Sequence, residues 1–157
     1  MVAALAQAGW EVRVAVSAAG ESWVTPDDLA DAVVRSAHRD VDEPRERRRP
    51  DLVLVCPATF NTVNKLAAGI ADTYTASLLA ETLGDSTPLV AVPMVNDRLW
   101  GHPSWESNLA GLSRAGVTFV DPQSVTPEPR AVASGTGEQV TADFDPASLV
   151  HRLATWM

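Results

Sequence analysis

The stretch "DLVLVCPATFNTVNKLAAGIAD", residues 51–72, carries the signals that decide the fold. Its first residues, 51–56, are almost continuously apolar, which predicts a buried strand. A polar turn follows at 57–61, and the pattern then predicts a helix over 62–71. A strand that runs through a short turn into a helix is the repeating unit of parallel α/β sheets. The open question is what the polar turn binds.

The same alternation extends along the rest of the chain. Apolar strands of this kind, alternating with helices, indicate a parallel sheet covered on both faces. The sequence therefore predicts an α/β fold with a doubly wound, Rossmann-like parallel sheet. Further strands are expected at 11–17, 88–93 and 117–120, and further helices at 2–8, 25–38, 73–83, 104–116 and 146–156.

Length and composition argue for a single domain. The chain has 157 residues, of which 46% are hydrophobic, enough to bury one core. Within it we expect a core over 1–122, a flap or loop over 123–145 and a C-terminal helix over 146–157. Residues 39–50 are charged and bracketed by prolines, which predicts a solvated loop.

Charge and cysteine content exclude several functions. A net charge of −8 argues against a nucleic-acid partner and against an anionic membrane surface. No run reaches the roughly 18 to 20 apolar residues that a membrane span needs. The single cysteine, Cys56, rules out an internal disulfide and suits a reducing compartment. We expect a cytoplasmic protein without a metal site.

Polar turns follow several of the predicted strands, where parallel sheets bind their ligands. They are "SAAGESW" (17–23), "PATFNT" (57–62) and "PMVNDRLW" (93–100). Small residues let a flat ligand approach, helix starts bind anionic groups, and Asn side chains both donate and accept. The pattern suits a phosphorylated, planar ligand. In the competing interpretation Asn61 and Asn96 only cap helices and Ser17 only closes a turn.

Two of these turns resemble the signature motifs of the flavin-containing cysteine decarboxylase family. That family includes phosphopantothenoylcysteine decarboxylases and lantibiotic-type peptidyl-cysteine decarboxylases. Its first motif, Pro-Ala-Ser/Thr-Ala-Asn-Thr, is matched at 57–62 except for Phe60. Its second, Pro-x-Met-Asn-x-x-Met-Trp, is matched at 93–100 except that Val95 and Leu99 replace the methionines. The likeness runs from about residue 2 to 121.

The resemblance implies an FMN cofactor. In the family FMN lies across the strand ends, usually at a subunit interface of a trimer or a dodecamer, so a homo-oligomer is expected. Position by position, the residues implied at the flavin are Ser17, Trp23, Pro57, Ala58, Thr59, Ser77 and Met94.

The resemblance also implies a reaction. A cysteine carboxylate, at a peptide C-terminus or in a small conjugate, is oxidised to a thioaldehyde and then loses CO₂ to leave an enethiol. Asn96 aligns with the amide that meets the carboxylate, and His38 is the candidate base, with His102 as the alternative. Asn61, Trp100, Ser134 and Gly135 are the implied substrate contacts, the last two in a mobile flap.

Departures from the family pattern keep other functions open. The flap lacks the cysteine with which phosphopantothenoylcysteine decarboxylases reduce the enethiol, so the reaction is expected to end there. Val95 and Leu99 favour a flavin-binding or regulatory protein without turnover, and phosphopantothenoylcysteine decarboxylation is a further alternative. Family members begin with a strand that precedes a helix, and this chain opens inside that helix, so the sheet is expected to lack the family's first strand.

Overall fold

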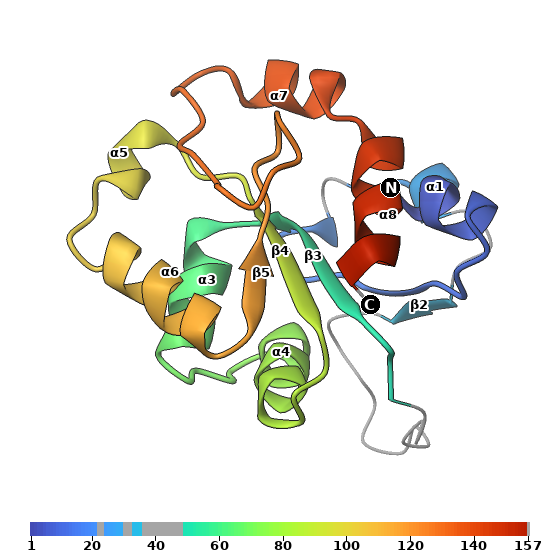
Figure 1. The fold of residues 1–157 in the computed structure, drawn as a ribbon, viewed down its shortest axis with the longest axis horizontal. Helices are drawn as coiled ribbons and strands as arrows, with labels where there is room; N and C mark the ends of the chain where they lie inside the picture. The colour runs from blue at the N-terminus through green and yellow to red at the C-terminus, as the bar shows by residue number, and fades with distance from the viewer. Residues whose placement is uncertain (22–23, 30–32, 36–48, 157) are drawn as a thin grey trace. The chain divides into compact units, whose positions relative to one another are not determined.

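The computed structural model describes residues 1–21, 24–29, 33–35 and 49–156, in which helices alternate with parallel strands (Figure 1). The chain divides into two compact units: residues 1–48, 72–75 and 145–157 form the first, and 49–71 and 76–144 form the second. A single folding domain stays a prediction. None of the helices in the described residues combines the length and the apolar character needed to cross a membrane.

In its described residues, the first unit contains a two-stranded parallel sheet and three helices. Its elements are α1 (Val2–Gln7), β1 (Arg13–Ala15), α2 (Pro26–Leu29), β2 (Val33–Arg35) and α8 (Pro146–Trp156). Strand β1 pairs with β2 in the register Arg13↔Val33 and Ala15↔Arg35. Helix α1 packs against α8. The predicted start of α2 at Pro26 and the whole of α8 are confirmed.

The helix predicted over 25–38 is wrong at residues 33–35. Helix α2 is described over Pro26–Leu29, and residues 33–35 form strand β2. Val33 and Val34 are β-branched, which lowers their helix propensity and suits an extended backbone. Pairing with β1 then supplies their backbone hydrogen bonds. Residues 36–48, which hold all but the last two residues of the charged loop predicted at 39–50, lie outside the described residues.

The second unit is built on a three-stranded parallel sheet of order β3-β4-β5. Its elements are β3 (Val53–Ala58), α3 (Phe60–Ala67), α4 (Tyr74–Gly84), β4 (Leu89–Pro93), α5 (Asp97–Trp100), α6 (Trp105–Arg114), β5 (Val117–Phe119) and α7 (Gly137–Asp143). Val53 lies opposite Leu89, and Leu89 opposite Val117. The parallel α/β class is confirmed, whereas α5 and α7 were not predicted.

Strand β4 lies at the centre of this sheet and is buried at all five of its positions. Successive side chains of a strand point to opposite faces, so both faces of the sheet are covered at β4. One face packs against α3, α4 and α6 through Val63, Leu79 and Leu112, which form one apolar cluster with Leu89 and Ala91. A strand buried on both faces explains why residues 88–93 are continuously apolar.

Helices α3 and α6 lie side by side and are joined by a polar contact (Figure 1). The Asn108 side-chain amide donates to Asn64 Oδ1 at 2.6 Å, and the Asn64 amide donates to the Phe60 carbonyl at 2.8 Å. Both asparagines are half-buried. The contact fixes α6 relative to the first turn of α3, which follows the predicted ligand-binding turn.

After β5 the chain is organised by a buried carboxylate. The Asp121 side chain is 1% exposed and accepts hydrogen bonds from the backbone N–H groups of Gln123, Ser124 and Arg130 at 3.0, 2.8 and 3.1 Å. The Ser124 hydroxyl donates to the same carboxylate at 3.0 Å. These bonds fold residues 121–130 into a compact loop. The first residues of the predicted flap, 123–130, are therefore held in place by Asp121.

Candidate functional site

The two motif turns lie next to each other at the carboxyl ends of β3 and β4. The Met94 N–H donates to the Ala58 carbonyl at 3.0 Å, and Ala58 lies opposite Pro93 in the strand pairing. The pairing register shifts between Val55 and Ala58, so the end of β3 departs from regular pairing where the first motif begins. The two motif turns therefore meet at one edge of the three-stranded sheet.

The first turn exposes a proline and an amide. Pro57 is exposed, whereas Ala58 is 1% exposed. The Thr59 hydroxyl oxygen caps α3 by accepting from the Thr62 N–H at 3.3 Å. Asn61 lies inside the first turn of α3 with its side chain exposed, so the interpretation of Asn61 as a helix cap is wrong.

The second turn fixes the orientation of Asn96. Its Oδ1 accepts from the Leu99 N–H at 3.0 Å and caps α5. A backbone N–H can only donate, so the amide atom of Asn96 that faces α5 is the oxygen. The Asn96 amide is exposed, and its Nδ2 takes no part in the cap. The capping interpretation is correct for Asn96. An amide nitrogen held in this way donates hydrogen bonds, which suits a carboxylate ligand.

The flap prediction is corrected in part. Helix α7 begins at Gly137, so the segment 123–145 is not a continuous loop. Val132 forms an isolated parallel bridge with Asn96, and the Ser134 hydroxyl donates to the Asp97 carboxylate. Ser134 therefore lies beside the second motif, where the resemblance places the substrate, but its hydroxyl already has a protein partner.

An aromatic cluster adjoins both motifs. Phe60 stacks on Trp105 with ring centroids 5.3 Å apart, and Trp100 lies 5.2 Å from Trp105. Trp105 is 1% exposed, and its indole N–H has no hydrogen-bond partner among the described residues. The His102 ring meets the edge of Phe60 at 5.6 Å. Phe60, which departs from the family motif, is thus part of the core between α3 and α6.

The predicted base His38 and the predicted flavin contact Trp23 lie outside the described residues. His102 is described and exposed. Its Nδ1 accepts from the Ser104 N–H at 3.2 Å and lies 2.9 Å from the Ser104 hydroxyl oxygen. Since the backbone N–H is a donor, a neutral His102 carries its proton on Nε2. His151 is exposed on α8, in the first unit.

Cys56 precedes the first motif at the end of an apolar run. Burial raises the pKa of its thiol to about 11. The thiol is therefore protonated near neutral pH, and a protonated thiol is a weak nucleophile and a weak reductant.

The remaining predicted cofactor contacts are distributed over both units. Ser77, on α4, donates its hydroxyl to the Ala71 carbonyl at 3.2 Å. Met94, the second residue of the second motif, is half-buried. Ser17 belongs to the first unit and closes a turn, because its side-chain oxygen accepts from the Gly20 N–H at 3.1 Å. Its place beside a cofactor stays a prediction.

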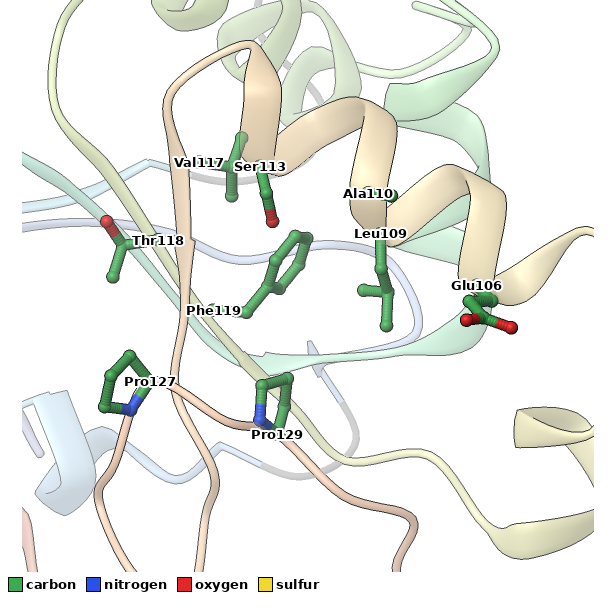
Figure 2. Close-up of a pocket in the computed structure, with 9 residues that line it drawn as sticks. All are labelled: Glu106, Leu109, Ala110, Ser113, Val117, Thr118, Phe119, Pro127 and Pro129. Carbon is green, nitrogen blue, oxygen red and sulfur yellow. The ribbon is translucent and has the colours of Figure 1, made fainter.

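A separate groove of about 430 Å³ opens along α6 and β5 (Figure 2). Leu109, Val117 and Phe119 contribute apolar side chains, and Pro127 and Pro129 line it from the loop after β5. It contains none of the residues that the sequence predicted for the ligand site. The groove is therefore not the pocket implied by the motifs.

The residues at this edge of the sheet fit a flavin. The exposed Pro57 and the half-buried Met94 leave a surface that a planar ring can approach, and the exposed amides of Asn61 and Asn96 are available for polar contacts. Parallel strands that end in such turns define an α/β protein of the cofactor-binding class.

The family follows from comparison with known proteins. The family model described as Flavoprotein matches residues 1–143, and the chain belongs to this family. The coenzyme A biosynthesis bifunctional protein CoaBC of Thermococcus kodakarensis is 37% identical over 75 residues, which cover 48% of this chain and 18% of that protein. The chain thus spans about a fifth of the length of that bifunctional relative.

Solved structures share the fold. A PPC decarboxylase variant complexed with pantothenoylaminoethenethiol superimposes with a TM-score of 0.70 at 19% identity, over 99% of this chain and 88% of that one. The FMN-dependent cysteine decarboxylase TvaF from thioviridamide biosynthesis has a TM-score of 0.68 at 27% identity, over 80% of this chain and 82% of that one. The Rossmann-like flavoprotein fold is confirmed.

Proposed function

We propose that the chain binds FMN and catalyses oxidative decarboxylation of a cysteine carboxylate to an enethiol. The substrate is a peptide that ends in cysteine or a small cysteine conjugate. The observation that carries the proposal is the 3.0 Å hydrogen bond from Met94 N–H to the Ala58 carbonyl, which joins the two motif turns beside exposed amides. FMN, when bound, supplies a two-electron acceptor.

The predicted residues have distinct roles in this proposal. Pro57, Ala58, Thr59, Ser77 and Met94 contact FMN. Asn61, Trp100, Ser134 and Gly135 contact the substrate. Asn96 donates from Nδ2 to the substrate carboxylate. A neutral amide orients the carboxylate without the strong charge stabilisation that an arginine would give to the group that must leave.

The chemical balance supports an enethiol product. The substrate loses CO₂, and two electrons and two protons pass from its Cα–Cβ–S unit to the oxidised cofactor. Returning those two electrons to the enethiol would require a proton donor beside it. Cys56, the only cysteine of the chain, lies in β3 and outside the segment 123–145. The name of the PPC decarboxylase, a phosphopantothenoylcysteine decarboxylase, supports phosphopantothenoylcysteine as a second candidate substrate.

The proposed working form is a homo-oligomer, a trimer or a dodecamer, in the cytoplasm. A flavin-binding protein without turnover is the competing function, and the replacements at Val95 and Leu99 favour it. Val95 is 1% exposed and packs in the core, whereas Leu99 is 42% exposed.

The deciding experiment combines a spectrum with an assay. The purified chain is incubated with FMN, passed through gel filtration and examined for flavin absorption in the visible range. It is then given a synthetic peptide ending in cysteine or, separately, phosphopantothenoylcysteine. A mass loss of roughly 46 units, for CO₂ and two hydrogens, is expected. Retained flavin without mass loss would favour the non-catalytic function, and absence of bound flavin would refute the proposal.

The base is identified by paired variants. If His38 is the base, His38→Asn lowers kcat at neutral pH at least tenfold while His102→Asn does not, by the usual contribution of general bases. The reverse result assigns the role to His102, whose Nε2 carries the proton in the neutral ring.

A further inference from the structure

Residues 130–134, here called the strap, run alongside the second motif. The Val132 N–H donates to the Val95 carbonyl at 2.9 Å, and the Asp97 N–H donates to the Val132 carbonyl at 3.0 Å. These bonds make the parallel bridge between Val132 and Asn96. Val95 and Val132 are 1% and 6% exposed. The centre of the strap is thus fixed by backbone bonds and burial.

The distal end of the strap is held at Asp97, whose carboxylate bonds to both the hydroxyl and the backbone of Ser134. The Ser134 hydroxyl donates to Asp97 Oδ1, which also accepts from the Arg98 N–H at 2.9 Å. The bond from Ser134 is the main reason why the pKa of Asp97 is lowered. Gly135 follows with a φ of 87°, a backbone conformation that glycine adopts without strain. The chain therefore turns away directly after the contact.

We propose that Asp97 is a positioning residue that holds Ser134 and Gly135 beside Asn96. The inference rests on the proposed function, because Asn96 is where that function places the substrate carboxylate. Asp97 sets where the turn at Gly135 begins, and hence where the backbone of the strap meets the substrate. Since both side chains are exposed, the contact adds little to global stability, and its effect is local.

The test uses the full-length, FMN-loaded chain and four variants: Asp97→Ala, Asp97→Asn, Ser134→Ala and the Asp97→Ala/Ser134→Ala double variant. With a synthetic peptide ending in cysteine, Asp97→Ala is expected to raise KM about tenfold while kcat stays within about twofold, the size expected for a bond to a charged group. Asp97→Asn keeps an acceptor and should stay near wild type. The double variant should be no worse than either single variant.

A readout independent of turnover separates the strap from the proposed function. Amide hydrogen exchange at residues 133–136 should become at least about fivefold faster in Asp97→Ala and Ser134→Ala, with β4 unchanged. Glu138→Ala removes a nearby exposed charge without touching the contact and is the matched control. Unchanged exchange in Asp97→Ala overturns the inference. Faster exchange in a protein that never decarboxylates the peptide keeps the contact but refutes the proposed function and the positioning role.

Discussion

Asp121 shows how one residue organises the loop after β5. Burial by itself raises the pKa of its carboxyl, but the hydrogen bonds from Ser124, Gln123 and Arg130 outweigh burial and lower it. The folded state therefore binds the proton less readily than the unfolded chain. The stability that this carboxylate contributes is present above the ordinary aspartate pKa of about 4 and is lost as the pH falls from there through the folded pKa.

Asp121→Asn should therefore destabilise the protein by about 1–3 kcal/mol at pH 7 and flatten the loss of stability in acid. Urea unfolding at pH 7, 4 and 3 measures both effects. Asp51→Asn changes an exposed aspartate and serves as the control. Equal losses between pH 4 and pH 3 in the wild type and in Asp121→Asn would contradict this account.

Asn96→Asp separates the cap from the proposed carboxylate contact. An aspartate keeps an oxygen for the Leu99 N–H, so the fold and the flavin spectrum should persist. The added negative charge should repel the substrate carboxylate and lower kcat/KM at least tenfold. Parallel measurements of the flavin spectrum and of peptide turnover give the result, and unchanged turnover would remove Asn96 from the site.

At the scale of elements, the α3–α6 contact is held by a polar pair and by an aromatic stack. Asn108→Leu leaves the half-buried Asn64 Oδ1 without its donor and should cost about 1–2 kcal/mol. Replacing both asparagines with leucine should cost less than the sum of the single changes, because no lone partner remains. Urea unfolding of the two single variants and the double variant measures this coupling. A loss of stability in the double variant equal to the sum of the two single losses would contradict the prediction.

Phe60→Ala gives a prediction against the family pattern. Alanine is the residue in the family motif, yet in this chain Phe60 stacks on the buried Trp105. Its removal should cost about 2 kcal/mol through lost burial and stacking. Thermal or urea unfolding measures the change in stability. A Phe60→Ala variant that is more stable than the wild type would show that the stack does not stabilise the fold.

Local patterns in the sequence predicted most elements, and non-local contacts explain the failures. The apolar runs at 51–56 and 88–93 predicted β3 and β4, and at β4 burial on both faces explains the continuous signal. The start of α2 at Pro26 was also predicted from neighbouring residues alone. Strand β2 was missed because its pairing with β1 joins residues twenty apart in the register. At the site, Asp97 was missed because its partner Ser134 is 37 residues away.

For the whole molecule, ligand binding links the site to stability. If FMN binds the folded chain alone, a free concentration of about 100 times Kd adds about 2.7 kcal/mol to the free energy of unfolding. Thermal unfolding with FMN should therefore shift to higher temperature, and riboflavin, which lacks the phosphate, should have a smaller effect. Identical curves with FMN and without it would contradict specific binding to the folded chain.

The bridge between Asn96 and Val132 also has an evolutionary consequence. Residues 95–97 and 132–134 share backbone bonds and one side-chain contact, so a backbone shift in either segment displaces the other. The two segments are therefore expected to covary among relatives: a sequence that loses the acid at position 97 should also change its hydroxyl at 134. Selection for a new substrate would then favour coordinated substitutions in both segments.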